Sequence, residues 1–209
     1  MTTAALTSLV AASTSAGSPL WYFNRATGVV CLVLLTVVVV LGILVRRSRP
    51  IGTAPRFVVA AVHRNASLLT LVFLGIHIAT AVLDPYVTLN ITDAVLPFTA
   101  GYRPLWVGLG AVSLDLMLAI IATSVLRERI GVRAWRLVHW TTYASWPLAL
   151  AHGLGTGSDV GAWWMIAITA ACVFAVGLSV AWRINAARMV PEPMPVSGRS
   201  SAIRQDLVR

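Results

Sequence analysis

The chain contains four histidines that form two pairs with almost equal spacing. His63 and His77 are 14 residues apart, and His139 and His152 are 13 residues apart. Each pair encloses a mostly apolar stretch, HRNASLLTLVFLGIH and HWTTYASWPLALAH. Neutral imidazole is a common ligand of transition metals. If both stretches are helical, a rise of about 1.5 Å per residue places the two imidazoles of each pair roughly 20 Å apart along the helix axis. The spacing therefore predicts metal ligands at two separate levels.

The helices that carry these histidines are expected to cross a membrane. Hydrophobic residues make up 58% of the 209 residues, charged residues only 11%, and the mean hydropathy is +0.82, which lies outside the range of soluble domains. Because a helix satisfies its own backbone hydrogen bonds in hydrocarbon, we predict an all-α integral membrane bundle of about five transmembrane helices. The expected spans are Trp21 to Val45, Phe57 to Leu83, Leu105 to Leu126, Trp135 to Gly153 and Ala162 to Trp182.

Arginines are concentrated on one side of these spans. The segments between the first and second spans and between the third and fourth carry most of them, as does the carboxyl-terminal tail, whereas the opposite side holds only Arg25 and Arg103. Positive charge marks the cytoplasmic side, so we expect an external amino terminus, a cytoplasmic carboxyl terminus and a place in the cytoplasmic membrane. This distribution explains the net charge of +9 without a nucleic-acid partner. The expected organisation is a flexible external tail over residues 1–20, a transmembrane domain over 21–183 and a disordered cytoplasmic tail over 184–209.

The direction of the spans pairs the histidines across two helices. One helix lies between the two histidine-bearing spans, so these spans run in the same direction. His63 is then level with His139 near the cytoplasmic face, and His77 is level with His152 near the outer face, which suits two bis-histidine haems b stacked across the bilayer. A spacing of 14 leaves two side chains about 40° apart around a straight helix, and a spacing of 13 leaves them about 140° apart. The fourth span therefore requires a distortion, which we expect at Pro147.

This arrangement resembles the ferric-reductase-like transmembrane domain, a family that includes ferric reductases, NADPH oxidases and the haem subunit of bacterial methionine-sulfoxide reductase systems. The resemblance rests on the two histidine pairs and extends to NRATGVVCLVLLT in the first span and WRLVHWTTYASWPLALAHGLGTGSD around the fourth. It covers about residues 20 to 185 and implies that the four histidines ligate two haems b. Many members have six helices, and the eukaryotic enzymes carry a flavin and nicotinamide dehydrogenase domain that is missing from this sequence. The resemblance therefore implies a separate electron donor.

Arginines near the histidine levels are candidates for binding the haem propionates, which need cationic partners in a low-dielectric region. On the cytoplasmic side, Arg64 follows the first histidine directly, and Arg133 and Arg136 come shortly before the third. The candidates on the outer side are Arg25 and Arg103. The alternative for each is contact between the guanidinium and the lipid headgroups.

Three further side chains within the spans are candidates for a role. Phe73 and Trp146 are the aromatic residues nearest mid-span and could relay electrons between the two levels, with simple packing as the alternative. Asp115 lies midway along the third span, where a carboxylate is costly, so it either transfers a proton or forms a neutral hydrogen-bonded contact. The glycines that could admit a porphyrin ring, or serve helix contact alone, are Gly75, Gly108 and Gly110.

The function predicted from these features is electron transfer across the membrane, from a cytoplasmic flavin- or NAD(P)H-linked donor to an external acceptor such as ferric iron, a flavoprotein or a reductase partner. We expect an oxidoreductase component without a catalytic side chain of its own, with a flavin, FMN or FAD, on this chain or on a partner. One alternative is a quinol-linked cytochrome b anchor subunit of a redox complex. Another is a metal-ion transporter, although transport favours ligands at one level with acidic neighbours.

Overall fold

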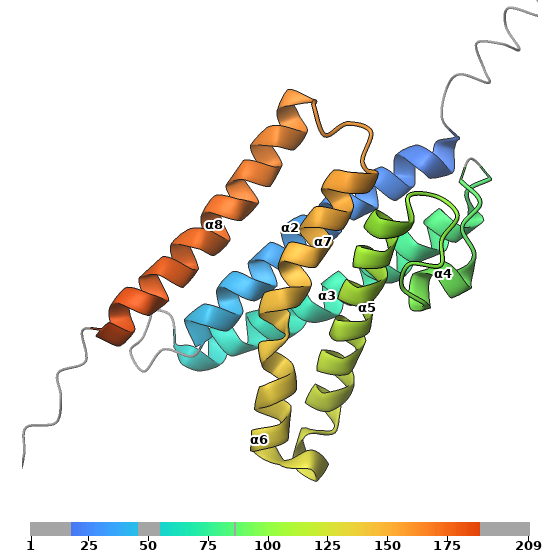
Figure 1. The fold of residues 1–209 in the computed structure, drawn as a ribbon. Coiled ribbons are helices and arrows are strands. Elements are labelled where there is room, and N and C mark those ends of the chain that lie inside the picture. Colours follow the sequence, from blue (N-terminus) through green and yellow to red (C-terminus); the bar gives the residue numbers. More distant parts are fainter. Residues whose placement is uncertain (1–17, 46–54, 86, 189–209) are drawn as a thin grey trace, which may run out of the picture.

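The computed structural model describes residues 18–45, 55–85 and 87–188 (Figure 1). Every regular element in this part of the chain is an α-helix, so the prediction of an all-α fold is confirmed. The helices are α2 (Pro19–Val45), α3 (Arg56–Leu83), α4 (Ile91–Val95), α5 (Pro104–Val125), α6 (Arg127–Trp140), α7 (Thr142–Thr156) and α8 (Trp163–Arg188). The tails were expected over residues 1–20 and 184–209. Of these, residues 1–17 and 189–209 lie outside the described residues, as does the arginine-bearing segment 46–54.

In the part of the chain that the structure describes, four helices are long and apolar enough to cross a membrane. They are Pro19–Val45, Phe57–Leu83, Pro104–Val125 and Trp163–Ala186. These helices agree with the first, second, third and fifth expected spans to within a few residues, because each span is a predominantly apolar stretch of the length that a bilayer requires. The last helix, α8, continues to Arg188 and so extends into the stretch expected as a tail.

The fourth expected span, Trp135 to Gly153, is not one continuous helix. It is divided between α6 and the 15-residue helix α7, and Thr141 lies between them. The amide of Thr141 donates to the carbonyl of Val138 at 2.9 Å, a bond to the third residue back that marks tighter, 3₁₀-like winding. Pro147 donates no hydrogen bond to the carbonyl of Tyr143, which weakens the helix in the adjoining turn. The distortion expected between the two histidines of this span is therefore present, but it is centred before the proline.

A serine joins the start of α2 to the end of α3. The Oγ of Ser18 accepts a hydrogen bond from the amide of Trp21 at 3.0 Å and donates to Asp84 Oδ1 at 2.8 Å. Asp84 ends α3 because Pro85 follows it and disfavours a helical conformation at the preceding residue. This contact holds the two helices side by side at the end of the bundle that contains His77.

The helices pack as two antiparallel pairs with α8 on one side. Helix α2 lies along α3, α5 lies along α7, and α8 packs against α2 (Figure 1). The buried core lies between α2, α7 and α8 and contains Leu32, Leu35, Val39, Ile43, Trp146 and Cys172. Many large apolar side chains on the outer faces of the helices are exposed, as expected for surfaces that lipid covers.

Several polar side chains inside the bundle form hydrogen bonds within and between helices. Thr36 and Thr70 donate to the carbonyl four residues earlier in their own helices. Across helices, Trp146 Nε1 donates to Thr36 Oγ1 at 3.0 Å, and the hydroxyls of Ser113 and Ser145 are 3.0 Å apart. Because few competing partners exist in hydrocarbon, these bonds hold α7 in register with α2 and α5.

Candidate functional site

The structure brings the four histidines together as the two predicted pairs. The ring centroids of His63 on α3 and His139 on α6 are 6.4 Å apart, and those of His77 on α3 and His152 on α7 are also 6.4 Å apart. The ring planes are steeply inclined, by 67° in the first pair and 84° in the second. Each pair lines its own cavity, and we name these the His63–His139 cavity and the His77–His152 cavity.

The two cavities are neighbours along the bundle. The His77–His152 cavity has a volume of about 380 Å³, and the His63–His139 cavity has a volume of about 250 Å³. Leu35, Thr70 and Met117 line both of them. A thin wall of side chains from α2, α3 and α5 therefore separates the two sites.

Three of the histidines are oriented by backbone carbonyls of a neighbouring helix. These contacts join Nδ1 of His63 to Val38 O (3.1 Å), Nδ1 of His77 to Asn24 O (3.0 Å) and Nδ1 of His152 to Trp106 O (2.9 Å). Because a carbonyl oxygen only accepts, Nδ1 carries the proton in each case and donates it. The other ring nitrogen, Nε2, then has a free lone pair and is available as a metal ligand.

A glycine lies four residues after each of these carbonyls and makes room for the imidazole. A Cβ atom would lie 3.0 Å from the His77 ring at Gly28, 3.3 Å from the His63 ring at Gly42 and 2.5 Å from the His152 ring at Gly110. The missing side chain thus lets each imidazole lie directly against a helix backbone. We name each carbonyl with its glycine a histidine seat; the seats are Asn24–Gly28 for His77, Val38–Gly42 for His63 and Trp106–Gly110 for His152.

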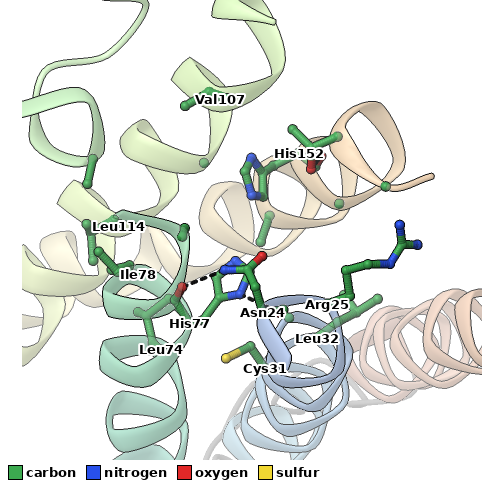
Figure 2. A pocket seen from close by; sticks show the side chains of 18 of the residues that line it. Asn24, Arg25, Cys31, Leu32, Leu74, His77, Ile78, Val107, Leu114 and His152 are labelled. Atoms are coloured by element: carbon green, nitrogen blue, oxygen red, sulfur yellow. Dashed lines mark hydrogen bonds between the residues drawn. The ribbon is translucent and has the colours of Figure 1, made fainter. Parts of the chain in front are cut away.

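Asn24 holds His77 at two points. Besides the backbone contact, its side-chain Nδ2 donates to the carbonyl oxygen of His77 at 2.8 Å and to Thr80 Oγ1 at 3.2 Å. Figure 2 shows Asn24 from α2 beside His77 from α3, with His152 from α7 on the other side of the cavity. The orientation of the His77 ring is therefore tied to the position of the α3 backbone.

Of the two arginines expected on the outer side, only Arg25 lines the His77–His152 cavity. Its guanidinium forms an ion pair of 2.5 Å with Asp159 and lies over Trp21, with Cζ 4.5 Å from the ring centroid. The Asp159 side chain is 39% exposed, which places this pair at the rim of the cavity. The other candidate, Arg103, is exposed and donates a hydrogen bond to the carbonyl of Gly155, which holds the start of α5 against α7.

The candidates expected near the other pair do not reach its cavity. Among the described residues that line the His63–His139 cavity there is no arginine, and the three expected there, Arg64, Arg133 and Arg136, are exposed. Trp140 and Tyr143 do line it. Arg183 of α8 donates a hydrogen bond to the Tyr143 hydroxyl, and its guanidinium lies 5.3 Å from the Trp140 ring centroid. Arg183 therefore brings a positive charge to the edge of this cavity.

An aromatic stack connects His139 to the surface. The Trp135 ring centroid lies 4.9 Å from that of His139, with 30° between the planes. The guanidinium of the exposed Arg127 lies over the same indole, with Cζ 4.5 Å from its centroid. Trp135 also lines the cavity and donates to Ser124 Oγ at 3.2 Å, which fixes α6 to the end of α5.

The remaining candidate side chains line neither cavity. Phe73 on α3 and Asp115 on α5 are half-buried and lie outside both sets of lining residues. Trp146 is buried in the core, where it bonds to Thr36. The expected glycines differ from one another: Gly110 lines the His77–His152 cavity and contacts His152, Gly108 packs against Phe98, and a Cβ at Gly75 would have nothing within 4 Å.

The geometry of each histidine pair fits a haem held between two imidazoles. Metal–imidazole bonds of about 2.0 to 2.1 Å on opposite faces of the iron place the two ring centroids roughly 6 Å apart, and the observed separation is 6.4 Å in both pairs. Among the described residues, no group of three or more His, Cys, Asp or Glu side chains could hold a metal ion. Two imidazoles at this separation could hold the iron of a haem, whereas a zinc site built from protein alone needs three or four ligands.

The histidine seats and the role of Asn24 were not predicted from the sequence, although the residue spacing in α2 contains a signal for two of the seats. In α2, the two seat carbonyls are 14 residues apart, and so are Gly28 and Gly42. This interval equals the spacing of His63 and His77 on the adjacent α3. A repeated interval in two consecutive spans predicts that the spans meet at the same two levels.

Fold and site together define a helical membrane protein with two histidine-pair sites along one bundle. A family model described as "Ferric reductase like transmembrane component" matches residues 27–150, more than half of the chain. The chain therefore belongs to the ferric-reductase-like transmembrane family, a family of membrane redox electron-transfer components, and the resemblance inferred from the histidine spacing is confirmed. The match includes three of the four histidines and ends just before His152. No curated protein and no solved structure matches the chain.

Proposed function

We propose that this chain is a di-haem b-type membrane cytochrome that transfers electrons across the cytoplasmic membrane. The supporting observation is one geometry repeated at two levels, in which two imidazoles with centroids 6.4 Å apart line one cavity. When bound, a six-coordinate haem supplies reversible one-electron chemistry without an open position for a substrate.

The side chains between the cavities exclude water and keep the two sites close. Leu35 and Met117 are apolar, and Thr70 is buried with its hydroxyl bonded to its own helix. A short, dry separation favours electron transfer between the two levels. Phe73 and Trp146 stay proposals as relays, and their positions outside both cavities favour the packing alternative.

Arg25 is the proposed partner of the cofactor carboxylates in the His77–His152 cavity, because it lines this cavity and carries a fixed positive charge. In the His63–His139 cavity, we assign this role to Tyr143 with Arg183 behind it. The exposed arginines Arg64, Arg133 and Arg136 are better placed to contact lipid headgroups than to reach a cofactor.

The His63–His139 cavity is proposed to face the cytoplasm. Helix α6 lies at this end of the bundle (Figure 1) and carries four arginines and one glutamate, and positive residues mark the cytoplasmic side. A flavin- or NAD(P)H-linked donor would deliver electrons here, near the Trp135 stack. The His77–His152 cavity would then pass them to an external acceptor such as ferric iron, a flavoprotein or a reductase partner.

Transfer across a sealed membrane tests this function. The haem-loaded protein is placed in liposomes that enclose ferricyanide, and reduced FMN is added outside. Wild-type protein is expected to reduce the enclosed ferricyanide, whereas His77→Ala should retain the cytoplasmic haem but lose transfer to the enclosed acceptor. Wild-type vesicles that hold both haems yet reduce ferricyanide no faster than empty vesicles would contradict the proposal. Reduction by a lipid-soluble quinol, where reduced FMN and NADH with flavoproteins fail, would favour the quinol-linked anchor subunit.

A further inference from the structure

We propose that the three histidine seats are positioning devices that set the ligand planes and the redox potentials of the two haems. This inference rests on the proposed function, since it assumes that the histidines ligate haem. The residues that carry it are the seat carbonyls of Asn24, Val38 and Trp106 and the seat glycines Gly28, Gly42 and Gly110.

The seat holds an imidazole by two contacts on one face of a helix. In a regular helix the carbonyl of residue i accepts from the amide of residue i+4, so the seat glycine lies one turn beyond the seat carbonyl on the same face. The histidine Nδ1 is a second donor to that carbonyl, and the ring lies over the bare Cα of the glycine. Rotation of the ring about the Cβ–Cγ bond would break the hydrogen bond or bring ring atoms into contact with the helix backbone.

Two different helices provide the seats of the His77–His152 cavity. The seat of His77 is on α2 and that of His152 is on α5, so the angle between the two rings is fixed by how these helices are placed. The resulting angle is 84°, close to perpendicular. Crossed axial imidazoles make the iron π-orbitals nearly equal in energy, which gives ferric haem a highly anisotropic low-spin EPR signal; parallel rings give a rhombic signal.

The same hydrogen bonds act on the redox potential. An Nδ1–H that donates to a carbonyl makes the imidazole a stronger electron donor through Nε2. A stronger donor stabilises ferric iron and lowers the midpoint potential. Displacement of the ring from its seat should therefore raise the potential of the haem concerned and leave that of the other haem unchanged.

Glycine-to-alanine variants provide a graded test because the clearances differ. A new Cβ would approach the ring to 2.5 Å in Gly110→Ala, 3.0 Å in Gly28→Ala and 3.3 Å in Gly42→Ala. Gly177→Ala on α8 is the matched helical control, since a Cβ there would have nothing within 4 Å and Gly177 lines neither cavity. The holoprotein in detergent is measured by EPR and by potentiometric titration of both haems.

The expected order of effect is Gly110→Ala, then Gly28→Ala, then Gly42→Ala. The first two should shift the EPR signal of the haem at His77 and His152 towards the rhombic type and raise its midpoint potential. Gly42→Ala should affect only the haem at His63, and the Gly177→Ala control should match wild type. If Gly110→Ala fails to accumulate, Gly28→Ala carries the same test on the same haem with a smaller displacement.

The inference and the proposed function fail in different ways. A wild-type protein that binds no haem would end the proposed function. A wild-type protein with two low-spin haems, together with Gly28→Ala and Gly42→Ala variants indistinguishable from Gly177→Ala in EPR and potential, would overturn the seats and leave the function standing. A shift in the wrong haem, such as a change at His63 in Gly28→Ala, would also overturn them.

Discussion

Single histidines on α3 distinguish the two sites, because each lines only one cavity. His63 lines the smaller cavity and His77 the larger one. Each of the variants His63→Ala and His77→Ala is therefore expected to lose one haem and retain the other, so that the haem content falls from about two to about one per chain. The measurement is the pyridine haemochrome content per protein. Loss of both haems in each variant, with the fold intact by circular dichroism, would show that the sites are not independent.

Variants of Arg25 and Asp159 test whether the Arg25 guanidinium is needed to bind a cofactor carboxylate or only to pair with the Asp159 carboxylate. An ion pair at an exposed rim contributes at most about 1 kcal/mol, so Asp159→Asn is expected to change stability little and to leave haem occupancy unchanged. Arg25→Leu should lower the occupancy of the larger cavity, because a cofactor carboxylate at this rim would lose its charged partner. Occupancy is measured by haem titration of the apoprotein. Equal losses in the two variants would mean that Arg25 acts through Asp159 alone.

At the scale of helices, replacement of Pro147 is expected to weaken haem binding even though it favours the helix. Pro147→Ala restores a backbone donor and is favourable by about 3 kcal/mol in intrinsic helix propensity. A straighter α7 would turn His152 away from the phase that the 13-residue spacing needs, so haem occupancy of the larger cavity should fall although the helix itself is stabilised. Haem content and the thermal unfolding temperature are measured together. Full occupancy in this variant would show that the break at Thr141 alone sets the phase.

The helices show how much of this fold the sequence could predict. Long apolar runs predict α2, α3, α5 and α8 because the bilayer imposes their length, and the histidine spacing predicts which helices meet. The break at Thr141 was expected only as a distortion near Pro147, since the proline determines which bond is missing but not how the preceding turn rewinds. The seats were missed because their acceptors are backbone carbonyls, which every residue type provides. The sequence could not predict which arginines reach a cavity, since a long side chain can point either to the cavity or to the lipid headgroups.

For the whole molecule, the arginine distribution predicts the orientation in the membrane. The carboxyl terminus and α6 are expected in the cytoplasm and the start of α2 outside. Labelling of single cysteines in intact cells with a membrane-impermeant maleimide measures this, in a background with Cys31 and Cys172 replaced by serine. A cysteine in place of Ser158 should react from outside and one in place of Arg129 only after lysis. The reverse pattern would invert the proposed direction of electron transfer.

The proposed electron transfer across the membrane depends on two haems within one chain. The direct measurement is a reduced-minus-oxidised spectrum of the purified wild-type protein combined with its haem-to-protein ratio. We predict about two haems b per chain, both six-coordinate and low-spin, as two pairs of imidazoles with centroids 6.4 Å apart require. A ratio near zero after supply of haem, or high-spin iron with a single protein ligand, would contradict the central claim.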